Sequence, residues 1–219
     1  MDFQEIESYL ESPNPQARMK ALVELRNHEP AIVVPLLKQR MYDKEFVVRS
    51  FVAMGLGNKQ TEEGFQALLA LIEHDNDPNV VAEAANSLAK FGDRAYPHLI
   101  ELFEQNSHWL IRQSIFGALD GLDEPAILLR LCRAGLEGED LVVQSTAIAT
   151  LSQLHGTEQA DAALEILLRA AISDIAMIRA QTARTLKEFA ADPRASAALS
   201  ELRHDVNLRV VGAAMESLL

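Results

Sequence analysis

The chain has 219 residues, of which 48% are apolar and only 5% are aromatic. It carries 32 acidic against 20 basic side chains, so its net charge is −12. This charge disfavours nucleic acid as a partner, because an acidic chain repels a phosphate backbone. No apolar run approaches the roughly 18 residues that a membrane span requires.

Alternating amphipathic helices are predicted along the whole chain, about fourteen in seven pairs. We call the first helix of each pair the A helix and the second the B helix. The A helices are expected at residues 2–11, 31–41, 65–73, 96–103, 126–136, 160–171 and 197–202. Each B helix, of about 12 residues, is expected to follow a short polar turn that can cap its first N–H groups. Such turns lie at residues 12–15, 75–78, 106–107, 139–140, 173–174 and 204–205.

One position recurs in every B helix. Aligning the copies places it at residues 18, 49, 81, 112, 144, 179 and 209, with steps of 31, 32, 31, 32, 35 and 30. Two of these positions hold Val81 and Gln144. The other five hold arginine, and we call the position the arginine column: Arg18, Arg49, Arg112, Arg179 and Arg209. So regular a period predicts tandem repeats stacked around one continuous core.

The arginine column is predicted to lie on the buried side of the B helices, because apolar residues stand one position before it and three, four and seven after it. A buried guanidinium needs a partner. We therefore interpret the column as a structural ladder, not a phosphate site. The candidate partners are helix-end carbonyls of a neighbouring repeat and the acids four to six residues earlier: Asp43, Asp77, Asp140, Asp174 and Asp205.

This repeat resembles the HEAT family. The Asp-Pro-x-Val-x-x-x-Ala-Ala pattern at 77–85, the segment 48–57 and the period near 31 resemble the short HEAT repeats named for phycobilisome lyases. The resemblance covers nearly the whole chain, although the pattern is broken at Val81, Gln144 and Glu216. It implies an all-α solenoid of about seven two-helix repeats, with right-handed superhelical curvature, in a single domain over residues 1–219.

The resemblance also implies a partner. The function that we expect is a non-catalytic scaffold that binds a protein through the concave face formed by the B helices. The expected partner is a phycobiliprotein subunit, during phycobilisome assembly or degradation, or a second HEAT-repeat subunit. The alternative is a subunit of a bilin lyase that attaches or detaches an open-chain tetrapyrrole at a phycobiliprotein cysteine. Phycocyanobilin is the ligand that this alternative implies; otherwise no cofactor is expected.

The candidate partner-binding residues stand two and five positions after the arginine column, where a B helix points away from the core. Phe51 and Met54 are apolar where water is expected, and Trp109 near the start of its helix is a second candidate anchor. The alternative is that these three side chains pack on a neighbouring helix. The other candidates are polar or small: Glu83, Asn86, Ser114, Gly117, Thr146, Ala149, Gln181 and Arg184.

Chemistry-bearing motifs are sparse. None of the six histidines forms a pair at the i, i+4 spacing of a zinc site, so no metal is expected. Cys132 is the only cysteine and stands in an apolar helical run, where a thiol usually behaves as a small buried hydrophobe. A chain with one cysteine and an acidic N-terminus without a signal peptide is predicted to be cytoplasmic.

Overall fold

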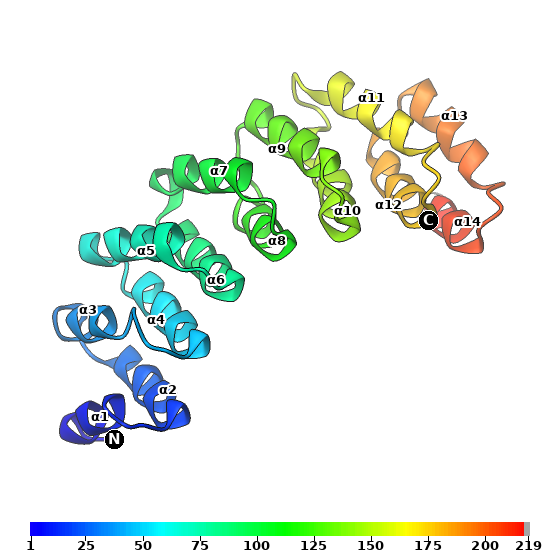
Figure 1. The fold of residues 1–219 in the computed structure, drawn as a ribbon. Coiled ribbons are helices and arrows are strands. Elements are labelled where there is room, and N and C mark those ends of the chain that lie inside the picture. The colour runs from blue at the N-terminus through cyan, green and yellow to red at the C-terminus, as the bar shows by residue number, and fades with distance from the viewer. Residues whose placement is uncertain (217–219) are drawn as a thin grey trace. The chain divides into compact units, whose positions relative to one another are not determined.

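The computed structural model describes residues 1–216, and all regular secondary structure in that range is helical. Fourteen α-helices follow one another in seven pairs (Figure 1). This confirms the predicted all-α class and the two-helix repeat. The chain divides into two compact units, Met1–Ala118 and Leu119–Leu219.

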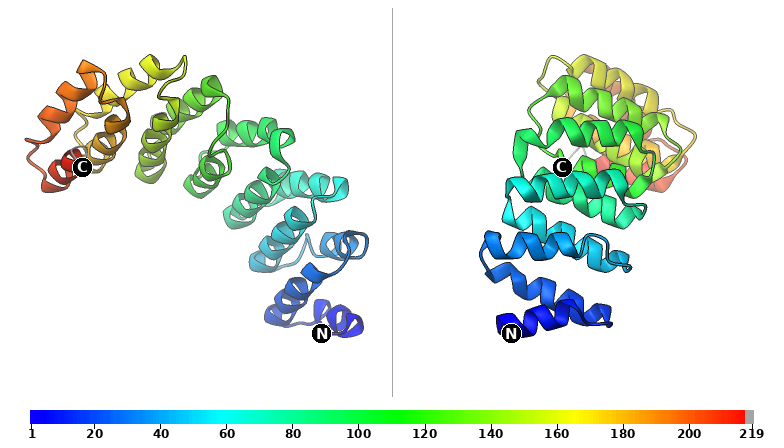
Figure 2. Two further views of the ribbon diagram at one scale, coloured as in Figure 1. Left: turned by 180° about the vertical axis from the view of Figure 1, so that it is seen from behind. Right: turned by 60° about the vertical axis from the view of Figure 1, so that its left-hand side comes forward.

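The first unit contains four repeats. Its B helices pack side by side in chain order, α2 on α4, α4 on α6 and α6 on α8, as the view from behind also shows (Figure 2). The A helices form the other layer. In chain order, the eight helices are α1 (Phe3–Leu10), α2 (Pro15–Glu24), α3 (Pro30–Gln39), α4 (Phe46–Lys59), α5 (Glu62–His74), α6 (Pro78–Ala89), α7 (Tyr96–Gln105) and α8 (Trp109–Ala118).

The second unit contains three repeats built in the same way, with B helix α10 against α12 and α12 against α14. Its helices are α9 (Pro125–Glu137), α10 (Leu141–Thr150), α11 (Ala160–Ala170), α12 (Ala176–Leu186), α13 (Pro193–Leu202) and α14 (Leu208–Met215). Four short 3-10 helices extend or precede these elements across the two units: Leu25–Asn27, Gly92–Arg94, Leu151–Leu154 and Lys187–Phe189.

Capping residues fix where several B helices begin. The side chains of Asn14, Asp77, Asp140 and Asn207 each accept a hydrogen bond from a backbone N–H in the first turn of the helix that follows. These bonds satisfy donors that have no partner within the helix. Proline at the first position of α2 and α6 needs no such partner.

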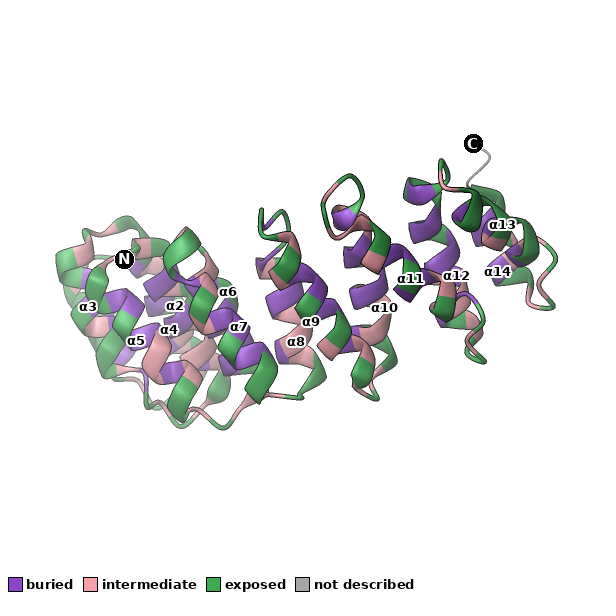
Figure 3. Cartoon of the chain, turned by 90° about the horizontal axis from the view of Figure 1, so that it is seen from above, coloured by how far each residue is buried: buried purple, intermediate pink, exposed green. Residues whose placement is uncertain are grey.

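The core of each unit lies between its two layers. Val80, Ala84, Ala85 and Leu88 of α6 are fully buried, and the corresponding residues of α10 are at most 2% exposed. Figure 3 shows buried residues along one side of the helices and exposed residues along the other. The apolar periodicity therefore identified the buried faces of these B helices.

A glycine allows α4 and α6 to approach each other closely. A methyl group added at Gly57 would lie 2.6 Å from Ser87 Cβ and 2.9 Å from Ser87 Cα. Ser87 itself is fully buried. Glycine is therefore required at residue 57 by the distance between the helices.

The single domain over residues 1–219 and its right-handed superhelical curvature stay predictions. Within residues 1–216, no helix is both long and apolar enough to span a membrane.

Candidate partner-binding surface

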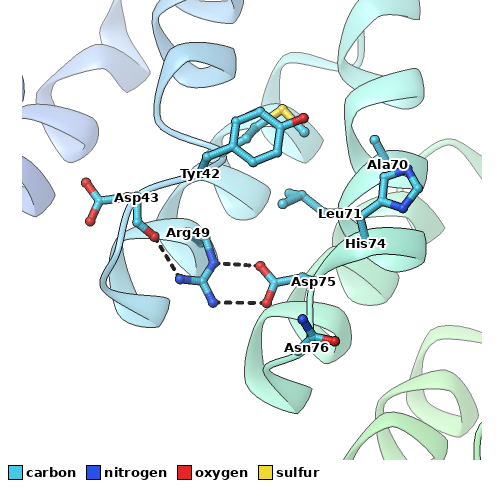
Figure 4. A pocket seen from close by; sticks show the side chains of 9 residues that line it. Tyr42, Asp43, Arg49, Ala70, Leu71, His74, Asp75 and Asn76 are labelled. Atoms are coloured by element: carbon cyan, nitrogen blue, oxygen red, sulfur yellow. Dashed lines mark hydrogen bonds and ion pairs between the residues drawn. The ribbon is translucent and has the colours of Figure 1, made fainter.

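The arginine column connects consecutive repeats within each unit. Arg49 Nε donates to Asp75 Oδ2 at 2.6 Å, and its Nη2 donates to Asp75 Oδ1 at 3.0 Å (Figure 4). A pocket of about 250 Å³, with Tyr42 and His74 in its lining, lies against this pair. Arg179 makes the same two hydrogen bonds with Asp205 of the following repeat. Arg18 pairs with Asp43 of the following repeat through one hydrogen bond from Nη2 and an ion-pair contact of Nε at 2.6 Å.

The column also binds a carbonyl of its own repeat. Five of its side chains donate to the backbone oxygen six residues earlier, at 2.6–2.9 Å: Arg18, Arg49, Arg112, Gln144 and Arg179. Gln144 keeps this bond even though it replaces arginine. Position −6 is the residue six positions before the column residue of the same repeat. Its backbone carbonyl accepts a hydrogen bond from the column residue of its own repeat. Its side chain can accept another from the column residue of the preceding repeat. Asp43 accepts both bonds, the first from Arg49 and the second from Arg18. The donor–acceptor pairs are Arg18–Ser12, Arg49–Asp43, Arg112–Asn106, Gln144–Gly138 and Arg179–Ser173.

The aspartate partners differ in part from those predicted. The partner of Arg49 is Asp75, whereas Asp77 caps α6, and Asp140 likewise caps α10. Asp174 is exposed, and it raises the pKa of Arg179 through its charge, behind the larger effect of Asp205. The sequence alone could not distinguish Asp75 from Asp77, because both are aspartates and they stand six and four residues before the column residue Val81.

The assignment of Arg209 to the column is wrong by two residues. Asp205 accepts a hydrogen bond from the N–H of Asn207, as Asp43 does from Glu45 and Asp75 from Asp77. Position −6 is therefore Asp205, and the column residue is Val211. Arg209 is exposed on the first turn of α14, while Val210 is fully buried. The Leu208-Arg209 pair resembles the apolar–arginine pair of the other repeats, but the turn at Asp205 shows which residue of α14 occupies the column.

The aspartates that pair with the arginine column, Asp43, Asp75 and Asp205, have lowered pKa values. Burial raises the pKa of Asp43 and of Asp75, but hydrogen bonds from the partner arginine and from backbone N–H groups outweigh burial. Both pKa values therefore lie below the ordinary value of 3.8. The hydrogen bond from Arg179 lowers the pKa of Asp205 in the same way.

We expect acid to remove the stabilisation that these pairs provide. A carboxylate whose pKa is lower in the folded than in the unfolded state stabilises the fold fully above the unfolded-state value. This contribution is lost as pH falls below about 3.8 and through the folded-state pKa. Urea unfolding of the wild type and of an Arg49→Met/Asp75→Asn variant, at pH 7 and at pH 3, measures the effect. The difference between their unfolding free energies should shrink at pH 3, and an unchanged difference would contradict the assignment.

An apolar pocket opens between the B helices α2 and α4. Its walls are Leu22 and Val23 from α2 and Phe51 and Met54 from α4. Val33 and Leu37 of α3 form the floor. Val23 is 39% exposed and Met54 is 40% exposed, so apolar surface faces solvent on both sides of the opening. We call this site the α2–α4 pocket.

Gly55 keeps the floor of the pocket open. A methyl group at this position would lie 2.9 Å from Leu37 Cδ1, so a side chain there would press on Leu37 and occupy space in the pocket. The sequence prediction found Phe51 and Met54 but placed no pocket beside them. Val23 could have indicated the pocket, because it stands five residues after Arg18, as Met54 stands five after Arg49, and both side chains are apolar.

Two cations border the α2–α4 pocket. Lys59 Nζ donates to the carbonyl oxygens of Arg26 and His28, at 2.8 and 2.6 Å. Arg26 is exposed. Among residues 1–216, neither side chain has a carboxylate within ion-pair distance. Their charge is therefore not neutralised locally, although the chain as a whole is acidic.

The other candidate residues of the first unit lie outside the α2–α4 pocket. Glu83 is half-buried on α6, and burial raises its pKa, against the lowering effects of a hydrogen bond from Ser87 and the charge of Lys90. Asn86 and Gly117 are exposed and Ser114 is half-buried. Trp109 is 45% exposed at the first position of α8, with its ring stacked on His108 at 6.2 Å between centroids.

In the second unit, Gln181 and Arg184 of α12 line a pocket of about 470 Å³ together with residues of α14. Arg184 Nε lies 3.3 Å from Glu216 Oε2, so the charge of this arginine is paired. Thr146 and Ala149 are half-buried on α10. They lie in a different unit from Ser114 and Gly117, and binding of a partner by these four residues stays a prediction.

Cys132 is expected to be chemically inert in the folded protein. Its side chain is fully buried in α9, and burial raises the pKa of the thiol to about 12. The reactive thiolate is therefore scarce at pH 8. A thiol assay with Ellman's reagent should detect no fast-reacting group in native protein and one group in urea. Rapid labelling of native protein would contradict this burial.

The described residues contain no cluster of three or more His, Cys, Asp or Glu side chains that could hold a metal ion. Asp43, Asp75 and Asp205 are instead engaged in ladder pairs. Asp77 and Asp140 cap helices. Two pockets are lined by B-helix residues that were predicted to bind a partner: the apolar α2–α4 pocket, which has a cationic border, and the pocket beside α12.

Comparisons with known proteins agree on the fold. Residues 33–120, about two fifths of the chain, match the family model described as HEAT repeats. No curated protein sequence is significantly similar to the chain. These findings and the helix pairs described above show an all-α protein with the packing of HEAT repeats.

Three solved structures share this fold at low sequence identity. The YIBA protein of Escherichia coli is 16% identical, with a TM-score of 0.68 over 99% of this chain and 82% of that one. The complex of CpcE and CpcF of phycocyanin lyase from Nostoc sp. PCC7120 is 20% identical, with a TM-score of 0.52 over 98% and 93%. An engineered protein is 19% identical, with a TM-score of 0.52 over 100% and 68%.

Proposed function

We propose that the protein is a non-catalytic scaffold that holds a protein partner against its B helices, and that this partner is a phycobiliprotein. The observation that carries the proposal is the α2–α4 pocket. Phe51, Met54 and Val23 place apolar surface on the side of the B helices that faces away from the core. Large apolar side chains around a pocket supply most of the binding energy in many protein interfaces.

The identity of the partner has two sources of support. The repeat pattern at 77–85 and 48–57 resembles the short HEAT repeats named for phycobilisome lyases. The fold also resembles that of the CpcE and CpcF complex of phycocyanin lyase. A second HEAT-repeat subunit is the other protein partner consistent with this complex.

A second candidate function is a subunit of a bilin lyase that attaches or detaches an open-chain tetrapyrrole. The likeness to CpcE and CpcF favours it, although at 20% identity that likeness concerns the fold alone. In this role the chain would position phycocyanobilin beside the acceptor cysteine, because correct placement alone can supply much of a rate enhancement.

One mixing experiment tests both functions. The protein is incubated with phycocyanobilin and apo-phycocyanin, then divided between size-exclusion chromatography and acid denaturation followed by absorbance spectroscopy. A complex without an acid-stable adduct supports the scaffold. An adduct that forms faster with the protein than without it supports the lyase subunit instead. If neither a complex nor an adduct forms, the phycobiliprotein assignment is wrong.

A further inference from the structure

We propose that the α2–α4 pocket receives an apolar side chain from an amphipathic helix of the partner, and that a carboxylate on the same helix pairs with Arg26 and Lys59. This inference rests on the proposed scaffold function and adds the chemistry of the segment that is recognised. It follows from the size of the pocket, the nature of its walls and the charge at its border.

The size of the pocket limits its occupant. Its volume is about 180 Å³, below the roughly 300–1,000 Å³ of sites that enclose a whole small-molecule ligand. The lining is apolar, with Val33 and Leu37 nearly inaccessible at the floor and Phe51 and Met54 at the rim. One large aliphatic or aromatic side chain fits this description better than a cofactor does.

The walls of the pocket favour a helix over an extended peptide. Both walls are α-helices, whose backbone N–H and C=O groups are bonded within the helix. An extended segment would find no sheet edge with which to pair its own backbone groups. A helical segment satisfies its backbone internally and can lay an apolar face along the groove between α2 and α4.

The border of the pocket specifies the charge of the partner. Lys59 is held by two carbonyl oxygens at the end of the short helix that follows α2, and Arg26 projects from that same helix. Both cations lack a carboxylate partner in the described part of the chain, while the whole chain carries a net charge of −12. A single carboxylate beside the apolar anchor would therefore meet local positive charge, whereas a lysine there would be repelled.

A selection from a peptide library tests the inference and does not require the partner itself. A phage-displayed library of helix-forming peptides, about 16 residues long, is selected on the full chain. Phage that bind a Val23→Glu/Met54→Glu variant are removed first. We expect the enriched peptides to share apolar residues at i, i+3 or i+4 spacing and an Asp or Glu about one turn from the anchor. Peptides without that carboxylate, peptides with lysine in its place, or no enrichment would overturn the proposal.

Binding constants then separate the pocket from the rest of the surface. By fluorescence anisotropy, a selected peptide should bind at least about tenfold more weakly to the Val23→Glu/Met54→Glu variant. Arg26→Glu should weaken the same peptide about tenfold and improve a copy that carries lysine in place of its acid. Val142→Glu is the matched control, because Val142 is a similarly exposed B-helix residue in the other unit, at 49%. Equal losses in the control and in the pocket variants would contradict the assignment.

Two further outcomes are distinguishable. Light scattering compares the wild type with the pocket variant; a dimer that is lost in the variant would assign the pocket to a second copy of this chain and overturn the proposal. A phycobiliprotein complex that is unaffected by Val23→Glu/Met54→Glu would refute this inference and leave the scaffold function intact. Peptide binding without any phycobiliprotein complex would refute the phycobiliprotein partner and leave the inference about the pocket intact.

Discussion

Replacing Arg49 with methionine should lower the free energy of unfolding by about 2–3 kcal/mol. Arg49 forms two hydrogen bonds with Asp75 and one with the Asp43 carbonyl, and the Asp75 side chain is only 6% exposed. Methionine keeps most of the apolar stem but leaves this carboxylate in the protein without its counter-charge. The loss arises mainly from that unpaired group, and urea denaturation at pH 7 measures it.

Two comparisons make the Arg49 experiment specific. Arg94→Met removes an exposed pair with Glu62, whose side chains are 49% and 62% exposed, so its effect should be much smaller. Adding Asp75→Asn to Arg49→Met should recover part of the loss, because the amide can be buried at a lower cost than the carboxylate. If Arg49→Met and Arg94→Met were equally destabilising, the ladder would not be a buried structural feature.

Gly57→Ala should destabilise the first unit by about 1–3 kcal/mol, although alanine is the better helix former. The new methyl group would lie 2.6 Å from Ser87 Cβ and 2.9 Å from Ser87 Cα. A backbone atom cannot move aside as the end of a long side chain can, so α4 and α6 would have to separate. Thermal denaturation followed by circular dichroism should show a lower midpoint than that of the wild type.

Gly117→Ala is the matched control for Gly57→Ala. Gly117 also lies within a B helix, but a methyl group there would have no neighbouring atom within 4 Å. We expect it to stabilise the protein by about 0.4–1 kcal/mol, because alanine restricts the unfolded chain and loses less backbone freedom on folding. Opposite signs for the two substitutions are the expected result. A loss of stability at both positions would indicate a general intolerance of alanine and not a close helix contact.

The fold could be predicted from the sequence because its determinants are local and recur. Val80, Ala84, Ala85 and Leu88 stand at helical spacing, and Asp77-Pro78 before them is a helix start that capping chemistry explains. Every such unit repeats after about thirty residues, so each copy supported the others. The prediction of a two-helix repeat therefore did not depend on contacts between repeats.

The pairing within the ladder could not be predicted because it is not local. Arg49 meets Asp75, 26 residues later, and the choice between Asp75 and Asp77 depends on how one repeat is placed on the next. Arg209 was misassigned for a related reason. The leucine–arginine pair at 208–209 imitates the repeat motif, whereas the hydrogen bonds that Asp205 accepts from Arg179 and from the N–H of Asn207 mark the true register.

The candidate site was predictable only in part. Phe51 and Met54 were visible as apolar residues at outward positions of one helix. The pocket beside them also needs Val23 from another helix and the missing side chain of Gly55, which leaves space next to Leu37. The periodic pattern of one helix cannot predict such a pocket, because the pocket is formed by residues of three helices and by the lack of a side chain at Gly55.

Val81 gives the first unit an uneven response to acid. The junctions of the first repeat with the second and of the second with the third each contain an arginine–aspartate pair, whereas the column position of the third repeat holds the buried apolar Val81. Protonation weakens an ion pair but leaves apolar contacts unchanged. As pH falls, amide hydrogen exchange in the first unit should therefore accelerate first in α1 to α4, while the contact of α6 with α8 persists, and this unit would open from its N-terminal end inward.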